Sequence, residues 1–150
     1  EAYSSRDPQA VAAVERWDTR YIWPVSGRIS SKYGKRKRKF HEGIDIVAPK
    51  GTPVLAARSG HVIYSGSQIR GYGNLVIIKH ADEFATVYAH LSKRHVRRGQ
   101  FISKGKRLGL VGSTGRSTSP HLHFEIRQGS LPINPLFHLQ GPVAANIVNR

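Results

Sequence analysis

The chain has 150 residues, with 24 Lys and Arg against 9 Asp and Glu, a formal net charge of +15, and neither Cys nor Met. This length suits one compact domain, and the lack of Cys excludes a thiolate metal site, a thiol nucleophile and a disulfide framework. No run approaches the ~18 consecutive apolar residues of a membrane span, so we expect a soluble domain or, given the initial Glu, a mature piece of a longer product.

The excess of basic residues predicts a surface that attracts polyanions. Nucleic acid, anionic lipid and an acidic cell-wall polymer are all candidates, and net charge alone does not separate them. Four of the nine acids lie within the first 18 residues. An acid in the rest of this basic chain is therefore of interest for a local role.

A short amphipathic helix is predicted near the N-terminus. An Asp-Pro pair at 7–8 fits an N-cap followed by proline at the first helical position. Apolar side chains then repeat at three-residue spacing from Val11 to Trp17, which predicts a helix that ends at about Thr19. We interpret residues 1–22 as a helical brace or a linker.

The rest of the chain has the short apolar runs and frequent turn residues of an all-β domain. A turn at 23–27 leads into a strand predicted over 28–33 and ended by Gly34. Short β-branched runs follow, separated by Gly, Ser, Asn, Asp or Pro, at 53–57, 61–65, 74–79, 84–91, 107–111 and 121–127. We expect one β-rich domain over 23–139 and a tail over 140–150.

The first candidate site motif is His41-Glu-Gly-Ile-Asp45. Gly43 and the β-branched run that follows it favour a strand over a helix, and in an extended strand the two side chains would lie about 13 Å apart. To share a metal, His41 must lie in a loop that folds back at Gly43 while Asp45 projects from the strand. The alternative is an exposed loop histidine and an aspartate that caps a turn.

The second candidate motif is His121-Leu-His123-Phe-Glu125, which follows a loop rich in Gly, Ser and Pro. Alternation with apolar residues predicts a half-buried strand with both imidazoles on one face, roughly 7 Å apart. Two such imidazoles can share a metal, or one can bind it while the other transfers protons. The alternative is a pair of solvated histidines on an amphipathic strand.

A third motif, Tyr88-Ala-His90-Leu-Ser92, ends a predicted strand. Together the three motifs supply two imidazoles and a carboxylate for a tetrahedral zinc site with an open fourth position, and two more imidazoles for proton transfer. In this order they resemble the lysostaphin-type (LytM-like) zinc metalloendopeptidases of bacterial cell walls, over about residues 23–139. The stretch 71–80 is similar to Gram-negative envelope proteins of that family.

The resemblance implies a fold and a set of roles. The fold is a folded antiparallel sheet with a groove across one face. One zinc ion would be bound by His41, Asp45 and His123, with His90 and His121 as the catalytic pair beside it. Which of the pair is the general base stays open, and Glu125 is interpreted as supporting the ligands or solvated. The remaining histidines lack partners at motif spacing and are interpreted as structural or exposed: His61, His80, His95 and His138.

Substrate contacts are expected around the first ligand. Some relatives place a tyrosine a few residues before that ligand to steady the transition state, and Tyr33 is the candidate here. The intervening stretch consists of Lys35, Arg36, Lys37, Arg38 and Lys39. These five like charges form either a groove wall that attracts an anionic cell wall or a solvated loop.

The function implied is hydrolysis of peptide cross-links in peptidoglycan, with the bond between D-alanine and meso-diaminopimelate as the expected target in a periplasmic or secreted protein. The alternative is a non-catalytic envelope regulator that activates amidases, for which envelope or division proteins are candidate partners. Nucleic acid is not expected, because no helix-turn-helix, stacking motif or zinc-finger spacing is present. The oligomeric state is left open by the sequence.

Overall fold

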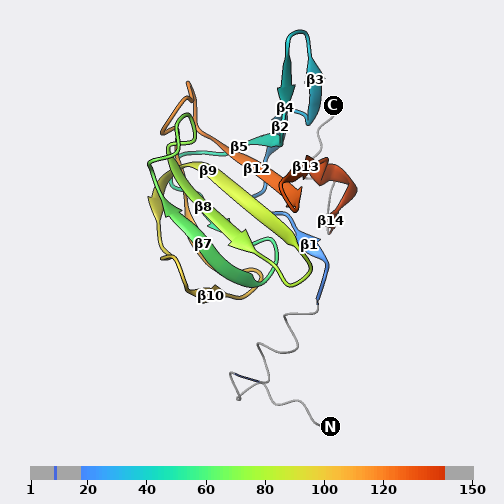
Figure 1. The fold of residues 1–150 in the computed structure, drawn as a ribbon. Helices are drawn as coiled ribbons and strands as arrows, with labels where there is room; N and C mark the ends of the chain where they lie inside the picture. The colour runs from blue at the N-terminus through green and yellow to red at the C-terminus, as the bar shows by residue number, and fades with distance from the viewer. Residues whose placement is uncertain (1–8, 10–17, 141–150) are drawn as a thin grey trace.

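The computed structural model describes residue 9 and residues 18–140, and strands dominate that part of the chain (Figure 1). The strands are β1 (Tyr21–Ile22), β2 (Arg28–Ser31), β3 (Gly34–Arg36), β4 (Lys39–His41), β5 (Ile44–Val47), β6 (Pro53–Leu55), β7 (Gly60–Gly66), β8 (Asn74–Lys79), β9 (Phe84–Arg94), β10 (Phe101–Ile102), β11 (Arg107–Val111), β12 (His121–Gln128), β13 (Leu131–Ile133) and β14 (Leu139–Gln140). A 3-10 helix, η1 (Pro135–Phe137), precedes β14. None of the described helical segments is long and apolar enough to cross a membrane.

The main sheet is antiparallel and is organised around its longest strand, β9. Its order is β10-β7-β8-β9-β12-β5-β2, with β11 joined to β6 and β9, and β13 joined to β12. One edge of β9 pairs with β12 up to Ala89 and with β11 from Leu91 onward. The partner changes at His90, whose φ of 64° lies in the left-handed region. His90 therefore marks the point where the sheet divides.

The main core lies on one face of β5 and β12. Ile44 and Ile46 from β5 pack there with Leu122, Phe124 and Ile126 from β12, and all five are fully buried. Successive side chains on a strand point to opposite faces, so the polar residues between these apolar ones point away from the core. That opposite face carries Asp45, His121, His123 and Glu125.

A smaller apolar cluster supports this polar face. Val87 and Ala89 of β9 lie directly opposite Glu125 and His123 in the β9–β12 register, so they share their face. They pack with Leu75, and the partly buried rings and side chains of Tyr64, Tyr72 and Ile77 cover them. The polar residues thus lie beside a packed apolar cluster on the same face of the sheet.

The fold class predicted from the sequence is confirmed: the described chain is nearly all β with antiparallel pairing in the main sheet. The runs predicted at 74–79 and 107–111 coincide with β8 and β11. The run at 84–91 continues to Arg94, and the run at 53–57 ends at Leu55. The helix predicted to end at about Thr19 lies almost wholly outside the described residues, as does the tail beyond Gln140, so the domain boundaries stay predictions.

Two local predictions around residue 34 were wrong. The strand predicted over 28–33 ends at Ser31, and Gly34, with a φ of 122°, begins a strand and does not end one. The basic stretch, for which a groove wall and a solvated loop were both left open, forms a two-stranded antiparallel hairpin, β3–β4, with Gly34 opposite His41. We call residues 34–41 the basic hairpin; it projects from the main body in Figure 1. Backbone pairing between β3 and β4 holds the basic hairpin in this conformation, although its like charges repel one another.

Candidate metal centre

Strand register brings the three predicted ligands together. Asp45 of β5 lies directly opposite His123 of β12, and both side chains point away from the core. His41 is the last residue of β4, and the chain then turns through Gly43 into β5. A Cβ on Gly43 would lie 2.3 Å from the carbonyl oxygen of Phe124, so only glycine lets this turn lie against β12. The fold-back at Gly43 was predicted, although His41 ends a strand and does not lie in a loop.

The ligand atoms converge on one carboxylate. Asp45 Oδ1 lies 2.8 Å from His123 Nδ1 and 3.4 Å from His41 Nε2. The donor atoms of these three residues all lie within 4.8 Å of one another. Tetrahedral zinc with ligands at ~2.1 Å places its donor atoms about 3.4 Å apart. Two imidazoles and a carboxylate in this arrangement therefore fit a zinc ion with small adjustments.

Both histidines of the predicted ligand set donate from one ring nitrogen to an acceptor, which turns the other ring nitrogen toward Asp45. His41 Nδ1 donates to the carbonyl oxygen of Lys32 at 2.9 Å, so Nε2 is the ring nitrogen turned toward Asp45. His123 has the reverse arrangement: Nε2 donates to Glu125 Oε2 at 2.8 Å, which turns Nδ1 toward Asp45. Such outer hydrogen bonds orient metal ligands and raise their basicity.

The pKa shifts of His123 and Asp45 also indicate a place where a cation can bind. Burial alone would lower the pKa of His123, but its hydrogen bonds to Asp45 and Glu125 and their charges raise that pKa to about 9. Burial would raise the pKa of Asp45, but hydrogen bonds from His123 and His41 hold it well below its usual range. A proton is thus retained between His123 Nδ1 and Asp45, in the place where a divalent cation would compete for the same lone pairs.

His90 and His121 lie beside this cluster with their rings 4.9 Å apart between centroids. His90 Nδ1 donates to the carbonyl oxygen of Thr114 at 2.7 Å, and His121 Nδ1 donates to that of Ser119 at 2.9 Å. In its neutral form each ring therefore has its lone pair on Nε2, and Nε2 of His121 lies 3.8 Å from Asp45 Oδ1. Burial lowers the pKa of His90, and the nearby histidines lower it further, so its neutral form is favoured near neutral pH.

Glu125 is buried, with 1% of its side chain exposed, so of the two interpretations of this residue the structure agrees with support of the ligands and not with solvation. Besides His123, it accepts hydrogen bonds from Tyr72 Oη at 3.1 Å and from Arg127 Nε at 2.7 Å. Arg127 in turn binds Glu42 Oε1 at 2.7 Å. This network fixes the position of Glu125 and, through it, the ring of His123.

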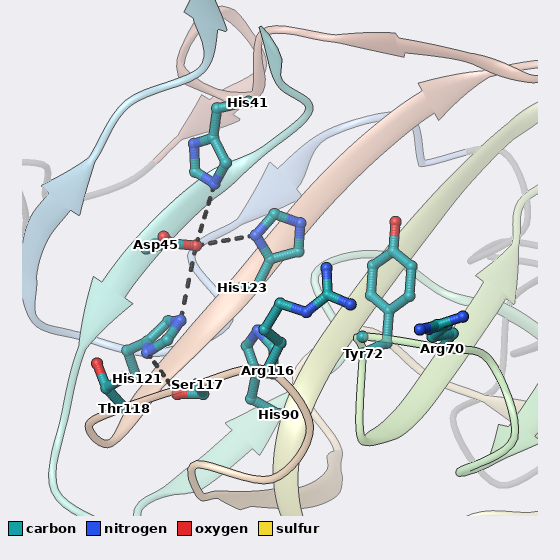
Figure 2. Close-up of a pocket in the computed structure, with 11 residues that line it drawn as sticks. His41, Asp45, Arg70, Tyr72, His90, Arg116, Ser117, Thr118, His121 and His123 are labelled. Carbon is teal, nitrogen blue, oxygen red and sulfur yellow. Dashed lines mark hydrogen bonds and ion pairs between the residues drawn. The ribbon is translucent and has the colours of Figure 1, made fainter. Parts of the chain in front are cut away.

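The predicted ligands and the His90–His121 pair line an open cleft of about 440 Å³, shown in Figure 2. Its lining residues are His41, Asp45, Arg70, Gly71, Tyr72, His90, Arg116, Ser117, Thr118, His121 and His123. One wall is made of the loops before β8 and before β12. These loops touch at Gly73 and Gly115, where an added Cβ on Gly115 would lie 2.4 Å from Gly73 N, and both glycines have positive φ. The wall is therefore held by close backbone contact.

All five residues predicted as ligands or as the catalytic pair line this cleft, whereas the residues predicted to contact substrate do not. Tyr33 Oη donates to the carbonyl oxygen of Pro132 at 3.0 Å, away from the cleft lining. The five basic residues lie on the basic hairpin, which meets the cleft only through His41. Sequence reasoning missed Arg70, Tyr72 and Arg116; their signal was their position within or beside the glycine-punctuated stretches Gly71-Tyr-Gly73 and Gly112-Ser-Thr-Gly115.

Comparison with protein families gives a match over residues 39–135 to the family described as peptidase family M23. Among curated relatives, murein hydrolase activator NlpD of Escherichia coli is 42% identical over 117 residues, which are 78% of this chain and 30% of that protein. DD-carboxypeptidase/endopeptidase Mpg of Neisseria meningitidis is 46% identical over 118 residues, 75% of this chain and 27% of that protein. The chain thus spans about a third or less of the length of both relatives.

Solved structures share the fold. A zinc-containing peptidase from Vibrio cholerae matches with a TM-score of 0.73 and 32% identity, over 82% of this chain and 40% of that chain. The catalytic domain of the antimicrobial peptidase lysostaphin from Staphylococcus simulans matches with a TM-score of 0.67 and 33% identity, over 72% of this chain and 88% of that chain. The arrangement of strands around the cleft is therefore similar to that of two peptidases.

Proposed function

The chain belongs to peptidase family M23, and from this premise we propose that it is a zinc-dependent endopeptidase that hydrolyses peptide cross-links of bacterial peptidoglycan. The observation that carries the proposal is the convergence of His41, Asp45 and His123 on one point, with the imidazoles of His90 and His121 beside it. A non-catalytic binding module has no need for two proton-transfer groups next to a metal site.

The proposed metal ligands are His41 Nε2, Asp45 Oδ1 and His123 Nδ1. Zinc bound there would supply Lewis acidity, which polarises a scissile carbonyl and lowers the pKa of water toward neutrality. The similar zinc-containing peptidase from Vibrio cholerae supports the choice of metal. Three protein ligands would leave the remaining coordination position open toward the cleft, as in catalytic zinc sites.

His90 and His121 are the proposed catalytic residues. In its neutral form either ring can accept the proton of the attacking water at Nε2, and as an imidazolium it can donate that proton to the leaving amine. The carbonyl oxygens of Thr114 and Ser119 hold the two Nδ1–H groups, so each ring is fixed in the tautomer that this chemistry needs. The lowered pKa of His90 makes it a base that is available at neutral pH.

The proposed bond is the cross-link between D-alanine and meso-diaminopimelate, in a periplasmic or secreted protein. The name of the Neisseria relative, a DD-carboxypeptidase/endopeptidase, supports a bond of this type. The apolar cluster beside the cleft and the open groove suit an extended peptide chain. Peptidoglycan is the proposed partner, and no nucleic acid is proposed.

A second candidate is a regulator that activates other wall hydrolases without cutting the wall itself. It is favoured by one observation, the 42% identity to murein hydrolase activator NlpD. Envelope or division proteins would then be the partners. The two candidates differ in what they require of the cleft: a regulator needs its shape, whereas an endopeptidase needs the metal and both free imidazoles.

The deciding experiment is digestion of purified peptidoglycan by the zinc-loaded protein, followed by mass spectrometry of the released fragments. New peptide termini that disappear in His121→Ala and upon chelation are the expected result, and their masses identify the bond. If the zinc-loaded protein releases no fragment while it stimulates an added amidase, the regulator is correct and the endopeptidase proposal fails.

A further inference from the structure

Two arginines line the cleft without a partner. Arg70 lies in the loop before β8 and Arg116 in the loop before β12, and both side chains are exposed. Within residues 18–140, neither guanidinium has a hydrogen-bond or ion-pair partner, although Arg127 beside the same cleft is paired with Glu125 and Glu42. Figure 2 shows both unpaired arginines on the Tyr72 side of the cleft.

The backbone that carries these arginines is fixed. Arg116 N donates to the carbonyl oxygen of Gly71 at 3.0 Å, which ties one arginine loop to the residue next to Arg70. A Cβ on Gly71 would lie 3.9 Å from Arg116 Cζ, so the guanidinium lies over Gly71. The two arginine side chains therefore start from one braced wall of the cleft.

The cleft offers these arginines no anion of its own. Asp45 is surrounded by His41, His121 and His123, and the Glu125 carboxylate is shared by His123, Tyr72 and Arg127. Each acid near the metal site thus already has its cations and donors. Because the acids of the cleft are already paired, the two arginines would bind an anionic group that belongs to the ligand.

We propose that Arg70 and Arg116 form a carboxylate-binding subsite that selects peptides with a free carboxylate next to the cleaved bond. The proposal rests on the proposed peptidase function, because a peptide substrate makes carboxylate the expected anion. A guanidinium binds carboxylate through two parallel hydrogen bonds, which gives direction as well as charge. At a partly solvated rim such a contact changes affinity by about 10-fold or more.

Two kinds of peptide carry such a carboxylate on the carbon that bears the scissile nitrogen. One is a stem peptide that ends in D-alanyl-D-alanine, where the group is the C-terminal carboxylate. The other is a cross-link to meso-diaminopimelate, where the D-centre supplies the amide nitrogen and keeps its own carboxylate free. A glycine-chain bridge has no carboxylate at this position. The subsite would therefore favour DD-bonds over bridges of neutral residues.

The test compares each of these two substrates with its own amidated form, in which the carboxylate becomes a carboxamide of nearly equal size. For the wild type we expect kcat/KM to favour the free acid by about 10-fold or more for at least one of the two substrates. In Arg70→Gln/Arg116→Gln this preference should fall to about 2-fold or less. The substrate that shows the preference identifies the source of the carboxylate.

A matched control removes the same charge elsewhere. Arg97→Gln/Arg98→Gln changes two exposed arginines that do not line the cleft, and it should keep the wild-type preference. Arg116→Lys keeps the charge but not the two-pronged geometry, so an intermediate preference is expected. A wild type that cleaves acid and amide equally, or a double variant with the wild-type preference, overturns the subsite.

A binding measurement separates failure of the subsite from failure of the proposed function. Calorimetry with the free-acid and amide forms of the D-alanyl-D-alanine peptide reports the same preference without turnover. If the wild type cleaves neither peptide but binds the acid more tightly, and the double glutamine variant loses this difference, the subsite stands and the peptidase proposal fails. Equal affinity of the wild type for acid and amide removes the subsite whatever the activity.

Discussion

The cleft and the basic hairpin meet at His41 but differ in their charged side chains, since the acids of the cleft are paired and the basic residues of the hairpin are largely unpaired. In the cleft, strand register sets the distances, and the acids Asp45 and Glu125 are surrounded by histidine, tyrosine and arginine side chains. On the basic hairpin, Lys35, Lys37, Arg38 and Lys39 are exposed and have no acidic partner within residues 18–140. Short, partly buried contacts are worth most within the cleft, whereas exposed charges act over long range and are screened by salt.

The comparison predicts the largest effect for a metal ligand. His123→Ala removes one donor of three and leaves the Asp45 carboxylate without its closest partner, so zinc binding should be lost or severely weakened. Zinc per chain after dialysis, measured by mass spectrometry of the metal, checks this. His41→Ala and Asp45→Ala should behave alike, and wild-type zinc content in all three variants would show that the ligands lie elsewhere.

The next largest effect is expected for the catalytic pair. His90→Ala and His121→Ala remove a proton-transfer group but leave all three proposed ligands in place, so zinc content should be kept while hydrolysis falls by ~10²–10⁴-fold. Activity on a soluble cross-linked peptide and zinc content are measured on the same preparation. Near-wild-type turnover in either variant contradicts a catalytic role for that histidine.

Glu125→Gln should weaken the metal site without removing a ligand. The carboxylate that accepts from His123 Nε2 becomes a neutral amide, so the ring is held less firmly and its Nδ1 is less basic. A loss of about 10–100-fold in zinc affinity is expected, measured by competition with a chelator. Glu42→Gln is the matched control, since Glu42 also binds Arg127 but is not bonded to His123. Equal losses in both variants would assign the effect to Arg127.

The sequence predicted those parts of the site that depend on local spacing. Two histidines two residues apart on an alternating strand must share a face, and β12 places His121 and His123 in this way. The need for a fold-back at Gly43 followed from the length of an extended strand between His41 and Asp45. Local pattern does not specify which strands pair, however, so the contact of Asp45 with His123 came from family resemblance and not from periodicity.

The parts that could not be predicted depend on tertiary contacts of single residues. Tyr72 and Arg116 lie in loops without periodicity, and they reach the cleft because Gly73 and Gly115 let two backbones touch. The basic hairpin has the composition of a solvated loop, yet Gly34 pairs with His41, and the rings of Tyr33 and Phe40 pack with their centroids 5.1 Å apart. Such contacts cannot be predicted from charge composition alone.

The smallest effect at the metal, and the most selective one, is expected from the basic hairpin. Arg36 differs from its neighbours, because its guanidinium donates to the carbonyl oxygen of Lys32 at 2.6 Å, the same atom that holds His41 Nδ1. A variant that tests long-range charge should therefore keep Arg36. It replaces the other four basic residues with Gln: Lys35, Lys37, Arg38 and Lys39.

This four-residue variant should lower binding and lysis of whole sacculi and flatten their salt dependence, because the attraction of exposed charges is screened over ~8 Å at physiological salt. Zinc content and cleavage of a short neutral peptide should stay nearly constant. The control removes four exposed basic residues that precede or follow β10 in the chain and do not line the cleft: Arg97, Arg98, Lys106 and Arg107. An equal loss on sacculi in this control would assign the effect to net charge. A parallel loss on both substrates in the hairpin variant would mean that the hairpin shapes the site around His41.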